Sequence, residues 1–309
     1  MAVDDVYTKV LLHMDGADAA TTFTDESGLT WTRRGDAQID TAQSVFGGAS
    51  GLFDGAGDYI DTPDSATWIL DDGSDANLWT IDFRVRFNGD PGTAERGFCG
   101  QDVGDGANYW HFNLNGNALI FKQRASGVNT IVISNAWNPA DATWYHIALV
   151  KNGSSGYMMF VDGTQIGATQ TDTSLMANFA AVFTVGLGSG VVHNGWMDEF
   201  RLSKGIARWT ANFTPPIAAY TDVPPSIVVE SASFTLTGTD VNSYAIIGTL
   251  SAGSGSFTLT FTDLVRVVGS ESLPKLFYKS RDYVLSFGQK SYNLFYKAKD
   301  YILSFTRRS

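Results

Sequence analysis

The feature that most constrains the fold is a strict alternation of apolar and polar side chains over residues 78–87, LWTIDFRVRF. Apolar side chains from Trp79 to Phe87 alternate there with polar side chains from Thr80 to Arg86. A period of two places the two sets on opposite faces of a β-strand. The segment therefore predicts an antiparallel strand with one buried face.

Other segments extend this pattern along the chain. Residues 144–150, WYHIALV, are apolar on both faces and predict a central strand. Asp162 and Gly163 separate two apolar runs, which predicts a tight hairpin because both turn positions need a positive φ. No stretch of a dozen residues keeps a helical period without a glycine, so we expect an all-β fold, a β-sandwich.

A domain boundary is expected near residue 222. Proline pairs at 215–216 and 224–225 enclose a segment that is typical of an extended linker, and the composition changes after it. We therefore expect a sandwich over residues 1–222 and a smaller β module over residues 223–309.

The second part of the chain contains two internal repeats. SFTLTGTDV (233–241) recurs as SFTLTFTDL (256–264), and KLFYKSRDYVLSF (275–287) recurs as NLFYKAKDYILSF (293–305). These repeats predict short hairpins or a meander. So few residues form a thin core, and we expect this module to pack on a partner or to form a homo-oligomer.

The charge is divided between the two parts. The net charge of the chain is −11, yet residues 265–309 carry nine Lys or Arg against three Asp or Glu. The acidic body argues against nucleic-acid binding. The basic end indicates contact with a neighbouring acidic subunit, or else a β-domain with a solvated basic face.

Neither a signal peptide nor a membrane helix is expected from the sequence. Cys99 is the single cysteine, so no intrachain disulfide is possible. The first residues, MAVDDVYTK, lack the basic and apolar regions of a signal peptide, and no apolar run reaches the ~18 residues of a membrane helix. We expect a protein that is made soluble in the cytoplasm, without membrane insertion.

Five segments together resemble the concanavalin A-like lectin/glucanase superfamily, in the laminin-G-like form found in virion proteins of tailed phages. They are VLLHMDG (10–16), AQSVFGGASGLFDGAGDYI (42–60), LWTIDFRVRF (78–87), ATWYHIALVKNGSSGYMMFVDGTQIG (142–167) and GWMDEFRLSKGIARWTANFTPP (195–216). The resemblance implies a jelly roll of two curved antiparallel sheets, often bound to calcium and often recognising glycans. It also implies a location in the virion, as a tail, fibre or head-decoration protein.

Asp198 is the leading candidate for a metal ligand. Alternation within WMDEFRL places it on one face with Trp196, Phe200 and Leu202. A carboxylate on an apolar face needs compensation, and calcium, which binds carboxylate and carbonyl oxygens, would supply it. The family resemblance implies that Asp15 joins Asp198 in such a site. The alternatives are hydrogen bonds from backbone N–H groups or an arginine partner.

The acidic residues do not follow a hydrolase pattern. Glycoside hydrolysis needs two carboxyl groups that face one sugar. The acid pairs of this chain are adjacent in sequence, as Asp198 and Glu199 are, and adjacent side chains of a strand point to opposite faces. We therefore predict that the protein is not an enzyme.

Glycan-binding candidates lie in two predicted loops. Sugar binding requires an aromatic ring beside side-chain amides on loops. The first candidates, which follow one loop, are Asn108, Tyr109 and Trp110. The second candidates, in another loop, are His193 and Asn194. We expect His193 to be exposed. The alternative for Trp110 is a place in the core.

These observations favour a non-catalytic virion protein. Its sandwich would bind a host surface or glycan, and its C-terminal repeats would attach it to other virion proteins. The alternatives are a purely structural decoration subunit without sugar binding and a polysaccharide-degrading enzyme.

Overall fold

The computed structural model describes residues 7–71, 77–89, 91, 94–153, 156–172 and 174–220, and the backbone of seven strands between residues 235 and 307. The chain divides into two compact units. One comprises residues 7–220, and the other comprises residues 221–309 together with residues 1–6. Each unit is described by itself below.

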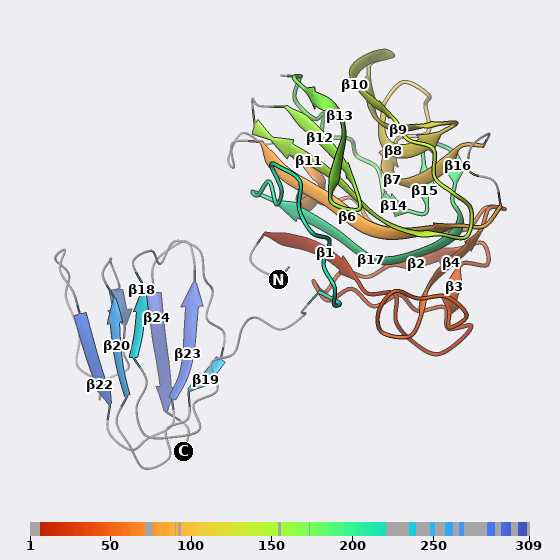
Figure 1. The fold of residues 1–309 in the computed structure, drawn as a ribbon. Coiled ribbons are helices and arrows are strands. Elements are labelled where there is room, and N and C mark those ends of the chain that lie inside the picture. Colours follow the sequence, from red (N-terminus) through yellow and green to blue (C-terminus); the bar gives the residue numbers. More distant parts are fainter. Residues whose placement is uncertain are drawn as a thin grey trace. The chain divides into compact units, whose positions relative to one another are not determined.

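The first unit is built on two antiparallel sheets (Figure 1). The eight strands of the first sheet are β1 (Thr8–Leu12), β3 (Gln38–Asp40), β4 (Ser50–Asp54), β6 (Leu78–Phe87), β11 (Trp144–Asn152), β12 (Tyr157–Val161), β13 (Thr164–Gln170) and β17 (Asn194–Lys204). Their order is β13-β12-β11-β6-β17-β4-β3, and β1 pairs with β17. The long strands β6 and β17 therefore lie at the centre of this sheet.

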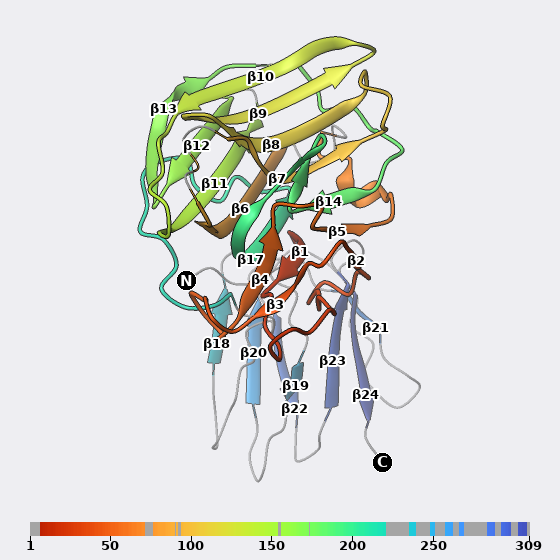
Figure 2. The ribbon, with the colours of Figure 1, turned by 90° about the vertical axis from the view of Figure 1, so that its right-hand side faces the viewer.

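The second sheet has seven strands, and Figure 2 shows them in their paired order, β10-β9-β8-β7-β14-β5-β2. They are β2 (Thr32–Arg34), β5 (Tyr59–Thr62), β7 (Arg96–Asp102), β8 (Tyr109–Asn115), β9 (Ala118–Ala125), β10 (Val128–Ala136) and β14 (Phe183–Val185). A short hairpin, β15 (Leu187–Gly188) and β16 (Val191–Val192), and one 3-10 turn, η1 (Ala66–Trp68), complete the described elements of this unit. No α-helix occurs among the described residues, and the predicted all-β sandwich is confirmed.

The core lies between the two sheets, and strand β6 contributes to it as its alternation predicts. Trp79, Ile81, Phe83, Val85 and Phe87 are all fully buried in one hydrophobic cluster. Burial of such side chains is worth about 1.5–3 kcal/mol each. The phase of β6 thereby fixes which face of the eight-stranded sheet is the inner face.

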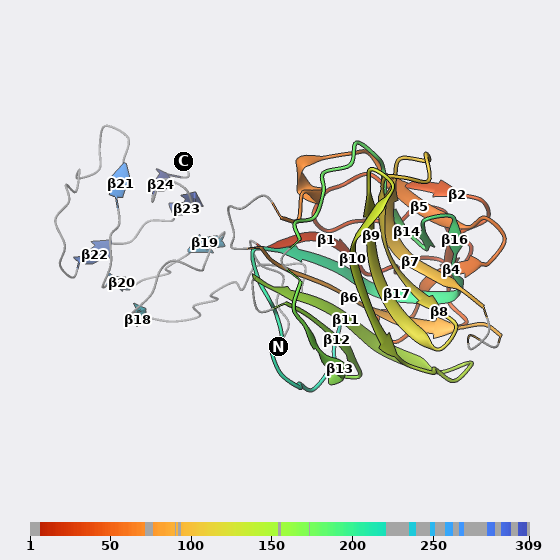
Figure 3. The ribbon, with the colours of Figure 1, turned by 90° about the horizontal axis from the view of Figure 1, so that it is seen from above.

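Part of the outer face of the same sheet is also covered. Trp209 and Phe213, which follow β17, stack on each other and pack against a second cluster that includes Ala148 of β11 and Phe160 of β12. Figure 3 shows β6, β11 and β12 side by side in this sheet. Residues 215–220, which were expected to be part of an extended linker, belong instead to the packed unit, and the remainder of the expected linker lies outside the described residues.

The alternation in β17 is interrupted by a β-bulge. The register with β6 shifts between Asp198 and Arg201, and Glu199 has a φ of 52°, which is uncommon for a residue with a side chain. The extra residue changes the phase, so Phe200 packs in the core while Trp196 lies on the outer face. Trp196 and Asp198 share the outer face, opposite Arg86 and Arg84 of β6, as expected. The expectation that Phe200 and Leu202 lie on that face too was wrong, because the bulge comes between them and Asp198.

The second unit contains short strands whose backbone is described. They are β18 (Thr235–Gly238), β19 (Gly248–Leu250), β20 (Phe257–Phe261), β21 (Arg266–Val268), β22 (Tyr283–Phe287), β23 (Tyr292–Lys297) and β24 (Ile302–Arg307). Strands β18 and β20 carry the two copies of the threonine-rich repeat and pair in parallel, with each residue opposite its equivalent in the other copy. Strands β23 and β24 form an antiparallel pair.

Candidate functional site

The loop between β3 and β4 is held by a carboxylate from β17. Asp198 Oδ2 accepts hydrogen bonds from the backbone N–H groups of Val45 and Phe46, at 2.7 and 3.2 Å. Asp198 is fully buried, and its second oxygen, Oδ1, has no hydrogen-bond partner among the described residues. The sequence left two alternatives to a metal ligand for Asp198: hydrogen bonds from backbone N–H groups, or an arginine partner. The first alternative thus holds for one of its two oxygens, Oδ2.

Burial dominates the electrostatics of Asp198. It raises the pKa of this carboxyl to about 7, while the N–H groups of Val45 and Phe46 oppose the shift. Glu199 and Asp15 add negative charge nearby and raise the pKa further. Two hydrogen bonds to one oxygen are thus too few to compensate for the loss of water around the charge.

Asp15 contacts the same loop. Its carboxylate accepts a hydrogen bond from the backbone of Ala49 and lies against Gly47, where an added Cβ would come within 1.9 Å of Asp15 Oδ1. Gly47 also has a φ of +61°, which favours glycine. The structure therefore brings Asp15 and Asp198 to one loop, although the two residues are far apart in sequence.

The fit of these residues to calcium is incomplete. Asp198 Oδ1 is a free, buried, hard oxygen, and Asp15 is an exposed carboxylate on the same loop. Among the described residues, however, no group of three or more His, Cys, Asp or Glu side chains is arranged to hold a metal. A cation here would need backbone carbonyls and water for most of its ligands.

The side chain of Glu199 lies on the same side of the sheet as that of Asp198. Its Oε1 lies 2.6 Å from His13 Nδ1, and its Oε2 accepts the backbone N–H of Tyr220 at 2.7 Å. The bond to Glu199 raises the pKa of His13. The prediction that Asp198 and Glu199 point to opposite faces was wrong, because the bulge at Glu199 removes the alternation on which it rested.

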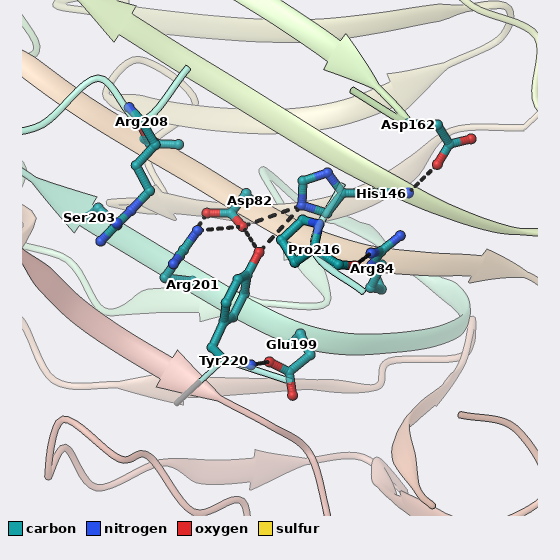
Figure 4. Close-up of polar contacts among 11 residues, drawn as sticks. Asp82, Arg84, His146, Asp162, Glu199, Arg201, Ser203, Arg208, Pro216 and Tyr220 are labelled. Atoms are coloured by element: carbon teal, nitrogen blue, oxygen red, sulfur yellow. Dashed lines mark hydrogen bonds and ion pairs between the residues drawn. The ribbon is translucent and has the colours of Figure 1, made fainter. Parts of the chain in front are cut away.

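A buried polar network occupies the centre of the outer face (Figure 4). Asp82 accepts hydrogen bonds from Arg201 Nε and Nη2, at 3.0 and 3.1 Å, and from the hydroxyl of Tyr220. His146 Nε2 lies 3.4 Å from the same carboxylate. Figure 4 shows Tyr220 reaching this group from the chain that follows β17.

The charges of this network compensate one another. Burial alone raises the pKa of Asp82, but Arg201 and His146 outweigh it and hold the pKa well below its usual range. Burial lowers the pKa of His146, and burial followed by the Asp82 charge raises that of Tyr220. The result is an ionised Asp82–Arg201 pair beside a neutral imidazole and a neutral phenol. Sequence reasoning did not foresee this network.

The first loop of glycan candidates serves mainly structural roles. Asn108 donates to Asp105 and accepts from the backbone of Ser126. Tyr109 is 9% exposed and stacks on His111. Trp110 is fully buried in the core, where its Nε1 donates to a glutamine, so it offers no surface to a sugar and is withdrawn as a glycan contact.

The second loop also differs from expectation. His193 is fully buried, and its ring packs against Phe53, Phe87 and Phe98. Burial lowers its pKa to about 3, so the ring is neutral. The prediction that His193 is exposed was wrong, since aromatic side chains of both sheets enclose it. Asn194 is half-exposed beside Gly55.

A row of half-exposed side chains crosses the part of the outer face that the chain after β17 leaves open. Trp144 of β11, Arg86 of β6 and Trp196 of β17 are cross-strand neighbours, and Leu52 and Gln38 continue the row on β4 and β3. We call these five residues the Trp-Arg row. The alternation of β6 indicated an outward Arg86, but the row depends on strand register, which no local pattern encodes.

Comparison with known families identifies the fold. The family described as the concanavalin A-like lectin/glucanases superfamily matches residues 54–208. The chain belongs to this superfamily. Comparison with curated proteins gives no match. The family match covers the central strands of both sheets and the whole of β17.

Solved structures share this fold at low sequence identity. The binding domain of Paraclostridial Mosquitocidal Protein 1 is 15% identical with a TM-score of 0.50, and the match covers 65% of this chain and 49% of that one. Domain 4 of a GH43 arabinanase from Geobacillus stearothermophilus, in complex with arabinotriose, is 15% identical with a TM-score of 0.48, over 66% of this chain and 95% of that one. Against the toxin domain, the match spans about half of that domain's length. At these identities the likeness concerns the fold alone.

Among the described residues, no helix has the length and apolar character that a membrane span requires.

Proposed function

We propose that this protein is a non-catalytic, glycan-binding adhesion protein whose sandwich presents the binding surface. The observation that carries the proposal is the Trp-Arg row. Proteins bind sugars by stacking aromatic rings such as indole on the sugar ring, and by hydrogen bonds from cations and side-chain amides to its hydroxyl groups. The toxin domain that shares the fold is named a binding domain, which is consistent with this role.

The state of the central acids supports a role without catalysis. Asp82 and Asp198 are fully buried, and Glu199 is 2% exposed. Both oxygens of Asp82 and of Glu199 bind groups of the protein itself. A glycosidase needs two carboxyl groups that reach one sugar, and these three reach none.

The setting we propose is a tailed-phage virion. The five segments that resemble virion proteins support it, as does the basic C-terminal part, which would attach to an acidic neighbouring subunit. Deletion of residues 226–309 is expected to leave a folded sandwich that no longer enters particles. Retained incorporation of the truncated chain would contradict this arrangement.

We further propose that calcium occupies the loop held by Asp15 and Asp198. The free, buried Oδ1 of Asp198 supports this, since a bound cation would compensate its charge. Calcium is expected to raise the Tm of the wild type and to leave the Tm of Asp198→Ala unchanged. A wild-type Tm that does not respond to a chelator or to added calcium would contradict it.

The central test is a glycan array probed with the full chain, with and without calcium. Binding to a defined set of glycans is expected. A blank array in both conditions would favour a purely structural decoration subunit. Release of reducing sugars from a bound polysaccharide would instead reveal an enzyme.

A further inference from the structure

We propose that the Trp-Arg row binds a sugar that carries a carboxylate, with Arg86 as the group that recognises the acid. The inference rests on the glycan-binding role proposed above and assigns that role a site and a ligand class. Three observations on the described residues carry it: the Trp-Arg row is uncovered, Arg86 is held in place without an acidic partner, and the indole of Trp144 makes no ring contact or hydrogen bond.

The row is open, whereas another part of the same face is covered. On β6, Thr80 and Asp82 are fully buried beneath the chain that follows β17, whereas Arg86 on the same face is half-exposed. Its cross-strand neighbours Trp144 and Trp196 are half-exposed as well. Side chains directly opposite in a sheet have Cβ atoms about 4.5–5.5 Å apart, so the three form one continuous surface.

Arg86 is held in place by neutral groups. Its guanidinium carbon lies 5.2 Å from the centroid of the Trp196 ring, and its Nε donates to Gln43 Oε1 at 2.9 Å. Trp196 is itself fixed, since its Nε1 donates to Asp40 at 2.6 Å. A guanidinium ordered in advance loses little conformational entropy when it binds a ligand.

Among the described residues, the charge of Arg86 has no acidic partner. No carboxylate lies within ion-pair distance of it in the part of the chain that the structure describes, whereas Arg34 pairs with Asp61 and Arg201 with Asp82. A sugar that covers Arg86 removes water from this cation, which is unfavourable unless the ligand brings an opposite charge. A carboxylate matches the planar fork of the guanidinium, which can donate two parallel hydrogen bonds to it.

Trp144 supplies the platform for the sugar ring. Its indole makes no ring contact and no hydrogen bond with any other described residue, although it is half-exposed beside Arg86. Trp196, in contrast, already carries Arg86 on its face. The sugar ring would therefore stack on Trp144 while its carboxylate reaches Arg86.

The test compares one acidic polysaccharide with its neutral counterpart. Full-length protein is titrated with oligomers of polygalacturonate, of alginate and of a sialylated glycan, and with carboxyl-reduced versions of each. We expect binding to at least one carboxylated probe, with affinity about tenfold or more lower for its reduced form, because charged hydrogen bonds are lost. Titration with sulfated glycans separates a preference for carboxylates from a general preference for anions.

Variants assign the effect to the row. Arg86→Gln and Trp144→Ala should each weaken binding about tenfold or more, and Arg86→Gln should remove the difference between the acidic probe and its reduced form. Arg33→Gln, an exposed arginine of β2, is the matched control and should bind as the wild type does. Thermal melting verifies that each variant is folded.

The outcomes separate the inference from the proposed function. Binding that is equally strong for acidic and reduced probes, or that survives Arg86→Gln, would overturn the inference and leave the glycan-binding role intact. A protein that prefers sulfated over carboxylated probes would overturn it as well. Absence of binding to every glycan would instead remove the proposed function itself.

Discussion

Replacement of Asp198 by asparagine should change how the stability of the sandwich depends on pH. Burial places the pKa of this carboxyl at about 7 in the folded protein, above its ordinary value of 3.8. The folded state therefore binds this proton more tightly than the unfolded state does. The stabilisation is complete below about pH 4 and is lost as the pH rises toward 7, when the buried group must ionise.

The size of the effect follows from linkage. A group contributes about 1.4 kcal/mol for each pH unit between its two pKa values, so the total for Asp198 is about 4 kcal/mol. Asparagine keeps an oxygen for the N–H groups of Val45 and Phe46 but does not titrate. Between about pH 4 and pH 8, the free energy of unfolding of the wild type should therefore fall by about 4 kcal/mol relative to that of Asp198→Asn.

Urea denaturation across this pH range, with a chelator present, measures the difference. Asp141→Asn, at an exposed aspartate, is the matched control and should follow the wild type. Added calcium should abolish the decline of the wild type, since a bound cation favours the ionised carboxylate, and should leave Asp198→Asn unaffected. Identical pH dependence of the wild type and Asp198→Asn in chelator would refute the reasoning.

Three further changes test the interior. Tyr220→Phe removes the hydroxyl that donates to buried Asp82 and should cost about 2 kcal/mol, seen as a Tm lower by about 4–8 °C; an unchanged Tm would mean that the bond contributes nothing. Gly47→Ala should lose about 1–3 kcal/mol in chemical denaturation, and more than Gly48→Ala, which has a positive φ but open space around it. Cys99 is fully buried, and burial raises its pKa, so a disulfide reagent should label it only after denaturation; rapid labelling of the native protein would contradict its burial.

The sequence was sufficient for the fold because its strongest signals are local. Alternation over residues 78–87 identifies the inner face of β6, and the turn at Asp162 and Gly163 joins β12 to β13. Each signal depends only on neighbouring residues, and a period of two has one structural meaning. The predicted architecture was therefore confirmed in the first unit.

The site was harder to predict because it depends on interruptions and on distant contacts. The bulge of β17 places Glu199 in a conformation that glycine usually adopts, and nothing in WMDEFRL signals it. The one extra residue puts Phe200 and Leu202 on the inner face, opposite the face of Trp196 and Asp198 on which they were expected. The local sequence around His193, between valine and asparagine, is typical of a loop. Its burial involves packing against Phe53, Phe87 and Phe98 of other strands, which the local sequence does not show.

The place of Tyr220 has a consequence for synthesis on the ribosome. Its hydroxyl completes the hydrogen bonds of Asp82, which lies 138 residues earlier in the chain. Until Tyr220 leaves the exit tunnel, the Asp82–Arg201 pair of the nascent sheet lacks the side chain that packs over it and donates to Asp82. We therefore expect the sandwich to reach its native state only after residue 220 has emerged, while the repeats that follow are being translated.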